Sequence, residues 1–305
     1  VKAEFDAAMG KPLAERVPQL NQLDEAIGRR VFEEGLSGEA KAEALRYRYH
    51  VQRQLAKYPD AYQTYASGLE AWREAGEGRR GRAAFMRDLN RWQRRGDHSH
   101  VAAICRQVRE DVVGDEAIEA ATLYHLAKAN YRMPGMLERA ASASEVLVTD
   151  HPESPWRAEA MRLLANAQNG LGQTKQALAT LKLLEQQYPG TKLAHYADMR
   201  RASFWEYRRG EPQKALSIYQ QTLEKYPDHM YGPYVHRQIA RLQGVIEKQL
   251  IDEALQGVDR GEGESPKDRA EAGPFEAHRH DPMVRATGGQ GGTPLDIVTP
   301  TLLSH

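Results

Sequence analysis

Apolar residues recur at helical spacing along most of the chain, from about Leu20 to Leu255. Steps of three or four residues place such side chains on one side of a helix, whereas strands show alternation with a period of two. Strand-like alternation is almost absent before residue 290. The longest stripe consists of Val235, Ile239, Leu242, Ile246 and Leu250. The pattern therefore predicts an all-α protein.

Short turns interrupt the helical pattern at regular distances. They are marked by glycine or proline at Gly35–Gly38, Gly76–Gly81, Gly96-Asp97, Pro134-Gly135, Gly172, Gly190 and Gly210. Helices joined by such short connections lie antiparallel to their neighbours. The predicted architecture is a stack of helical hairpins.

The hairpins repeat with a period of 37 to 38 residues. The equivalent positions are Gly135–Ala140–Pro152, Gly172–Ala177–Pro189 and Gly210–Ala215–Pro227. The glycine permits the turn, the alanine lets two helices approach closely, and the proline ends the second helix. We interpret Gly96 with Cys105 and Val108 as a fainter copy, and Tyr58-Pro59 as the end of a more degenerate one.

These residues resemble the tetratricopeptide repeat (TPR) family. Residues 158–191 place Leu164 and Ala165 at the Leu-Gly pair of that pattern, Ala177 at its alanine and Pro189 at its terminal proline. The endings "YPGT", "YPDH" and "HPES" are similar to those of cell-envelope TPR proteins of the Tol–Pal-associated and outer-membrane-assembly type. The resemblance implies a TPR-like α-solenoid that binds other protein subunits.

The resemblance also implies which residues line the concave groove of the solenoid, at positions 2, 5, 9, 12 and 13 of each repeat. Most of the residues there are cationic, amide-bearing or aromatic, and these types can bind carboxylates and peptide backbone or pack on apolar side chains. The predicted groove residues are His125, Arg132, Arg162, Asn166, Asn169, Arg200, Phe204, Tyr207 and Arg208.

Charge and cysteine content exclude several classes of protein. The chain has 42 basic and 42 acidic residues, so no net charge draws it to nucleic acid or an anionic membrane. Its single cysteine, Cys105, cannot form an intramolecular disulfide or a Cys-based zinc site. No apolar run is long enough to predict a membrane span.

Three local clusters could suggest chemistry, and each has a simpler explanation. The basic run Arg73–Arg95 is interpreted as the solvated side of an amphipathic helix, because Phe85, Leu89 and Trp92 share the opposite face. The "DHSH" and "EAHRHD" histidines lack a defined third metal ligand, and "TGGQGGT" lacks the Lys-Ser/Thr ending of a phosphate loop. We expect no catalysis, no cofactor and no metal.

Four segments are predicted: an N-terminal arm (1–19), degenerate hairpins (20–78), the TPR solenoid with a C-terminal capping helix (79–256), and an extended tail (257–305). The tail is rich in Gly and Pro and too poor in apolar residues to fold alone. Its scattered apolar residues are expected to anchor it on a neighbouring subunit. They are Phe275, Met283, Val284, Leu295, Ile297, Val298, Leu302 and Leu303.

The resulting hypothesis is a non-enzymatic scaffold, a subunit of a larger assembly held in part by its tail. A peptide-binding adaptor that uses the groove for acidic or C-terminal segments is the alternative, and an accessory subunit of an enzyme complex is the third. The expected partners are other proteins, with self-association as a further option, and not nucleic acid. The expected location is periplasmic, envelope-associated or extracellular, with the cytoplasm as the alternative.

Overall fold

The computed structural model describes residues 1–227 and 231–259, and the regular elements in these ranges are all helices. The all-α prediction is confirmed. The helices are α1 (Lys2–Met9), α2 (Leu13–Phe32), α3 (Gly38–Gln54), α4 (Tyr58–Glu74), α5 (Gly78–Arg94), α6 (His98–Asp111), α7 (Glu116–Arg132), α8 (Leu137–Asp150), α9 (Arg157–Gly170), α10 (Thr174–Gln187), α11 (Lys192–Tyr207), α12 (Pro212–Lys225) and α13 (Gly232–Asp259).

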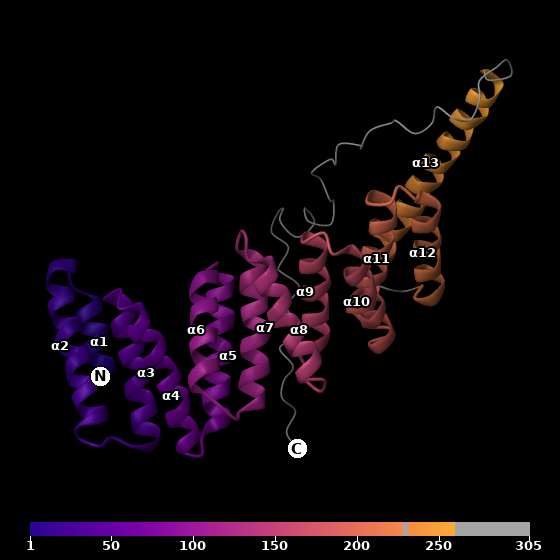
Figure 1. Ribbon diagram of the computed structural model, residues 1–305. Helices are drawn as coiled ribbons and strands as arrows, with labels where there is room; N and C mark the ends of the chain where they lie inside the picture. Colours follow the sequence, from indigo (N-terminus) through magenta and orange to yellow (C-terminus); the bar gives the residue numbers. More distant parts are fainter. Residues whose placement is uncertain (228–230, 260–305) are drawn as a thin grey trace. The chain divides into compact units, whose positions relative to one another are not determined.

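The chain divides into two compact units, Val1–Ile239 and Ala240–His305. In the first unit, consecutive helices from α6 to α12 pack against each other in chain order, as Figure 1 shows. The first helices of the repeats also touch one another, α7 with α9 and α9 with α11. Each repeat is therefore a hairpin that buries its apolar side against its sequence neighbours.

The three predicted second helices, α8, α10 and α12, begin and end as the repeat implies. Each has 14 residues and starts two residues after the turn glycine, and each is followed by the predicted proline. Their repeat alanines are buried, with Ala140 and Ala215 0% and Ala177 5% exposed. Helices can approach closely at these points because alanine adds only a methyl group.

Glycines at the predicted turns adopt the left-handed backbone conformation, with a positive φ, which residues that carry a Cβ rarely adopt. Gly172 and Gly210 have φ angles of 74° and 64°. One connection uses a different residue: Ala56, which follows α3, has a φ of 57°. It is the one residue other than glycine with a positive φ in the described ranges.

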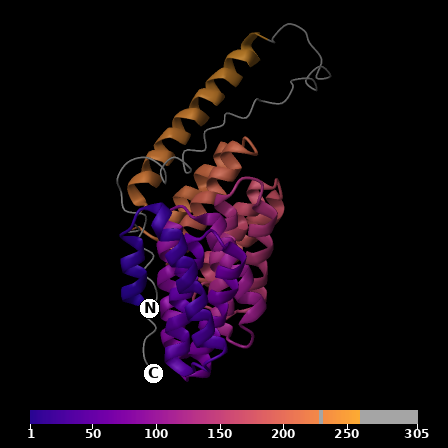
Figure 2. The same ribbon diagram turned by 90° about the vertical axis from the view of Figure 1, so that its left-hand side faces the viewer.

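The N-terminal segment differs from the predicted arm. Residues 1–19 are mostly helical, and α2 runs through Pro18 and across the expected boundary at residue 19. The α1 helix lies against α2 and α3 (Figure 2), where Ala8 is buried. A proline inside a helix removes one backbone hydrogen bond and crowds the carbonyl of the preceding turn, and the packing of Leu20, Leu23 and Ile27 compensates for that cost.

The interpretation of Tyr58-Pro59 as the end of a repeat was wrong. These residues begin α4, and Pro59 occupies its first turn. A proline can occupy the first turn of a helix or a position just after the end of a helix, because a backbone N–H is not needed at either place. The local sequence could not distinguish the two.

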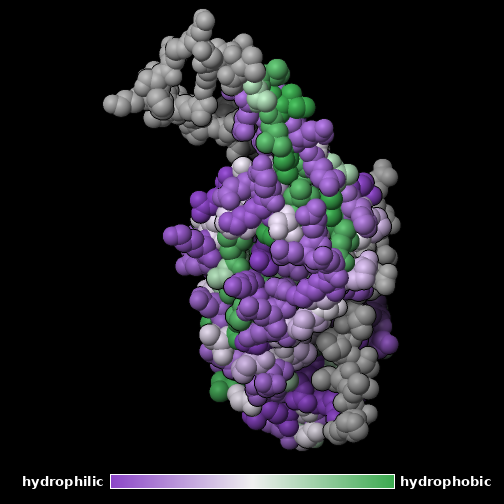
Figure 3. All heavy atoms as spheres, turned by 90° about the vertical axis from the view of Figure 1, so that its right-hand side faces the viewer, coloured by the Kyte–Doolittle hydropathy of each residue, from purple (hydrophilic) through white to green (hydrophobic). Residues whose placement is uncertain are grey.

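The predicted long stripe lies on α13, and its exposure grows along the helix. Val235 and Leu242 are 0% exposed, whereas Leu250 is 58% exposed. Figure 3 shows apolar side chains on the surface of this helix in green. The tail residues Phe275, Met283, Val284, Leu295, Ile297, Val298, Leu302 and Leu303 lie outside the described residues, as does the predicted extended course of the tail.

Candidate partner-binding face

Charged and aromatic side chains gather where the first helices α7, α9 and α11 lie side by side. We call this the first-helix face, and its members are Lys128, Tyr131, Arg132, Glu159, Arg162, Asn166, Tyr196 and Arg200. Tyr131 is influenced by all three helices: burial and the neighbouring Tyr196 raise the pKa of Tyr131, and the charges of Arg200, Arg162 and Arg132 oppose that rise. Residues from three successive repeats therefore share one electrostatic environment.

Arg162 is held in place by groups from two helices. Its Nε donates to Glu159 Oε2 at 2.7 Å, and its guanidinium lies 5.7 Å from the ring centroid of Tyr196. Burial is the largest single effect and lowers the pKa of Arg162, but Glu159, through its charge and its hydrogen bond, and Tyr196 together raise this pKa by more, so the side chain stays ionised. Tyr196 in turn donates its hydroxyl proton to Asn166 Oδ1 at 2.9 Å. The centre of the face is a connected network with a fixed geometry.

Lys128, a member of the face, lies over one of two buried aromatic rings that stack on each other. The rings of Tyr124 and Trp156 stack with centroids 4.6 Å apart and an angle of 14° between their planes. Lys128 Nζ lies 5.5 Å from the Tyr124 centroid. Burial lowers the pKa of Lys128, which is the expected effect of removing an ammonium group from water.

Two predicted groove residues are buried and cannot contact a partner in this fold. His125 is 0% and Phe204 9% exposed, because both point into the packing between helices and not away from it. Burial, and then the charge of Lys128, lowers the pKa of His125 to about 3, so it is neutral and not cationic. The repeat positions fix a residue on a helix, but neighbouring helices decide which of those positions remain exposed.

The other predicted groove residues are at least partly accessible. Arg132, Tyr207 and Arg208 are exposed, and Arg162, Asn166, Asn169 and Arg200 are half-buried. Arg162 and Asn166 belong to the network described above, and the charges of Arg132 and Arg200 act on Tyr131. Tyr207 and Arg208 lie at the C-terminal end of α11.

Sequence reasoning missed several members of the face. Glu159 occupies position 2 of its repeat, one of the positions that the resemblance marks, so this signal was available in the sequence. Lys128, Tyr131 and Tyr196 occupy other positions, and their role depends on packing between helices that the repeat pattern does not specify.

The clusters that sequence analysis set aside have structural explanations where they are described. The predicted amphipathic face of α5 is confirmed: Phe85, Leu89 and Trp92 are buried. In residues 1–227 and 231–259, no three His, Cys, Asp or Glu side chains form a group that could hold a metal ion. The histidines of "EAHRHD" and the "TGGQGGT" segment lie outside these ranges. Burial raises the pKa of the Cys105 thiol, which makes it a poor nucleophile.

None of the described helices is long and apolar enough to cross a membrane.

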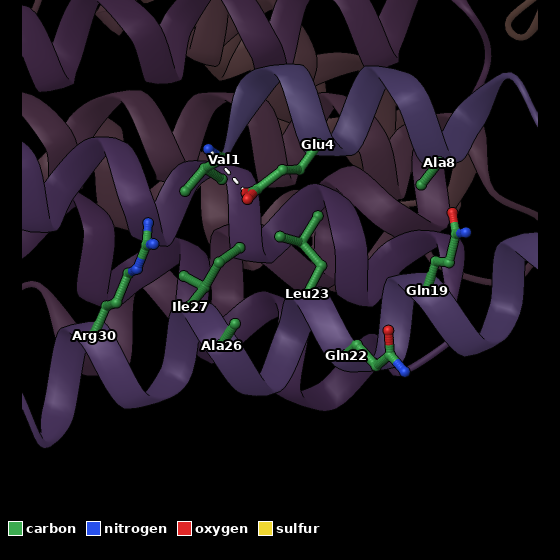
Figure 4. A pocket seen from close by; sticks show the side chains of 9 residues that line it. All are labelled: Val1, Glu4, Ala8, Gln19, Gln22, Leu23, Ala26, Ile27 and Arg30. Carbon is green, nitrogen blue, oxygen red and sulfur yellow. Dashed lines mark ion pairs between the residues drawn. The ribbon is translucent and has the colours of Figure 1, made fainter.

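A cavity of about 400 Å³ lies between α1 and α2 (Figure 4). Leu23, Ile27 and Ala8 form its apolar part, and the Val1 amino group pairs with Glu4 at 3.2 Å beside it. It contains no predicted site residue.

Helical hairpins stacked in chain order define the class of helical-repeat proteins. Comparison with family models specifies the class further: the tetratricopeptide repeat model matches residues 121–154, 159–191 and 196–229. These stretches correspond to α7–α8, α9–α10 and α11–α12, so the three clear copies predicted from the sequence are TPR repeats.

No curated protein matches the chain. Among solved structures, the chain is similar to YrrB, described as a TPR protein with an unusual peptide-binding site. The identity is 15%, the match covers 70% of this chain and 99% of YrrB, and the TM-score is 0.43.

Proposed function

We propose that this protein is a non-catalytic protein-interaction scaffold whose first-helix face binds an acidic segment of a partner protein. The observation that carries the proposal is that Arg162 contacts Tyr196 of the next repeat, and that Arg132, Arg162 and Arg200, one from each of three successive TPR repeats, all act electrostatically on Tyr131. TPR repeats are interaction modules, which supports a protein partner.

The charge of the face supports an acidic partner although the whole chain is neutral. The face contains four cationic side chains, Lys128, Arg132, Arg162 and Arg200, and one carboxylate, Glu159. Guanidinium groups bind carboxylates through two parallel hydrogen bonds, and Tyr131 and Tyr196 offer ring surface beside them. An extended peptide with alternating acidic and apolar residues would suit this combination.

The experiment compares labelled peptides of one design. An acidic peptide is titrated with the full chain, followed by fluorescence anisotropy, and its Glu→Gln counterpart serves as the peptide control. We expect the acidic peptide to bind more tightly, and its affinity to fall with salt. The double variant Arg132→Gln/Arg200→Gln should weaken binding at least tenfold, while Arg109→Gln, an exposed change on α6, should not. Equal affinity of the double variant would contradict the proposal.

A structural subunit held through its C-terminal segment is the second candidate. The Gly/Pro-rich composition of residues 257–305, with scattered apolar residues, favours it. Under this hypothesis the chain belongs to a cell-envelope assembly of the type that its repeat endings resemble, and deletion of 257–305 releases a folded protein from that assembly. Copurification of the truncated chain at unchanged stoichiometry would contradict it, and cell fractionation tests the location.

A further inference from the structure

A second cavity lies away from the first-helix face, where α3 ends and α4 and α6 begin. Its volume is about 360 Å³, which lies within the range of small-molecule sites. Six residues line it: Arg53, Tyr58, Tyr62, Asp97, Ser99 and His100. The three helices that build it are outside the stretches that match TPR repeats.

A buried histidine links two tyrosines at the wall of this cavity. His100 Nε2 lies 2.9 Å from the Tyr49 hydroxyl, and His100 Nδ1 lies 3.2 Å from the Tyr62 hydroxyl. Burial, and then the Arg53 charge, lowers the pKa of His100 to about 3, so its ring is neutral. A neutral imidazole has one N–H donor and one acceptor nitrogen. One tyrosine must therefore donate to the ring while the other accepts from it.

The surroundings of Tyr49 decide in which direction the protons are donated along the hydrogen bonds from Tyr49 through His100 to Tyr62. Tyr49 is 0% exposed, so its hydroxyl proton needs an acceptor inside the protein, because an unpaired buried O–H group is costly. In the described residues His100 Nε2, at 2.9 Å, is the acceptor within hydrogen-bond distance of this hydroxyl, so the Tyr49 proton goes to His100 Nε2. His100 Nδ1–H then donates to Tyr62. The O–H proton of Tyr62, which lines the cavity, is free to donate into it.

The charged residues of the cavity are of opposite sign. The Arg53 guanidinium lies 5.9 Å from the ring centroids of both Tyr49 and Trp92, and no ion pair joins it to a carboxylate in the described residues. Asp97 likewise has no cationic partner there, and its side chain does not cap α6. A ligand can therefore meet Tyr62, Ser99 and Arg53 as donors and Asp97 as an acceptor.

We propose that this cavity binds a small carboxylate that carries an N–H group next to it, such as an α-amino acid or the C-terminal residue of a peptide. The carboxylate accepts from Tyr62 and Arg53, which completes the hydrogen-bond chain through His100. The N–H group donates to Asp97. Inorganic phosphate fits less well, because all of its oxygens belong to one anionic group and it has no uncharged or positive N–H group to place beside the Asp97 carboxylate.

The test titrates the ¹⁵N-labelled full chain with four matched probes, and the amide signals of Ser99 and His100 report binding. L-leucine represents a free amino acid and N-acetyl-L-leucine a peptide C-terminus. L-leucinamide lacks the carboxylate, and 4-methylpentanoate lacks the N–H group. We expect at least one of the first two probes to shift these signals, with the last two at least tenfold weaker.

Variants then test the hydrogen-bond chain. Tyr62→Phe removes only the hydroxyl and should lower the affinity for the probe that binds about tenfold. Tyr47→Phe is the control, because Tyr47 packs against a different cluster, and it should leave this affinity unchanged. The Arg132→Gln/Arg200→Gln variant should bind the probe normally, so this proposal can fail or hold independently of the proposed function. Absence of binding, equal binding of L-leucinamide or 4-methylpentanoate, or an unchanged affinity of Tyr62→Phe would overturn it.

Discussion

Arg48 Nε donates to Asp24 Oδ1 at 2.8 Å, and this ion pair joins α3 to α2. Asp24 is 6% exposed and also accepts from Gln52 at 3.1 Å and from Lys57 at 3.0 Å. One carboxylate therefore ties together α2, α3 and the residue before α4. The Asp24 carboxylate can be buried at this position because each of its two oxygens accepts at least one hydrogen bond.

We predict that Asp24→Ala lowers the free energy of unfolding by about 2–3 kcal/mol, because it removes the carboxylate to which the half-buried Arg48 and Lys57 and the buried Gln52 donate. Urea unfolding followed by circular dichroism measures the loss. Glu25→Ala, at an exposed neighbouring position, is the control and should change stability by less than about 0.5 kcal/mol. A similar loss in both variants would show that the ion pair has no special role.

Ala56 offers a stabilising substitution. Its φ of 57° is costly for a residue with a Cβ, and Gly172 adopts a similar conformation after α9. We expect Ala56→Gly to stabilise the protein by about 0.5–1 kcal/mol, since the relief of strain exceeds the entropy that glycine adds to the unfolded chain. Ala75→Gly, at a φ of −75°, lacks this strain and should destabilise instead. If both substitutions changed the melting temperature in the same direction, backbone strain at Ala56 would not explain the effect.

Ala177 should not tolerate a larger side chain. It is 5% exposed at the close approach within its repeat, so Ala177→Leu is expected to cost about 1–3 kcal/mol through overpacking. Ala179→Leu, on the exposed side of the same α10 helix, should be nearly neutral. An unchanged melting temperature for Ala177→Leu would mean that the repeat alanines are not tightly packed.

His125 should make the fold sensitive to acid. Its folded-state pKa of about 3 lies below the unfolded value of about 6.5, so below pH 6.5 only the unfolded chain takes up the proton. The stability that depends on neutral His125 is present above pH 6.5 and falls by roughly 1.4 kcal/mol per pH unit as the pH decreases toward 3. Since His100 behaves in the same way, His125→Leu should reduce this slope without abolishing it.

The same variant should remain as stable as the wild type at pH 7.5. Neither ring nitrogen of His125 has a hydrogen-bond partner in the described residues, so no hydrogen bond is lost. The comparison requires unfolding curves at pH 4.5, 6 and 7.5, with His236→Leu as the exposed control. Parallel curves for wild type and His125→Leu would exclude the proton linkage.

The sequence by itself determined the helical class and the three clear repeats. The reason is that each signal acts locally. Gly172 allows the turn beside it, Ala177 sets a close contact within its own hairpin, and Pro189 ends the helix that precedes it. Such effects span fewer than about twenty residues, so their spacing can be recognised without knowledge of the fold.

Contacts between distant residues were decided only by the tertiary structure. Tyr49 and His100 are 51 residues apart in the sequence, yet the hydrogen bond between them sets the direction in which His100 donates to Tyr62. His125 occupies a position marked for the groove, but the helices around it bury it completely. A repeat pattern places a side chain on its helix, while its exposure, its charge state and its partners depend on the neighbouring helices, which the local sequence does not specify.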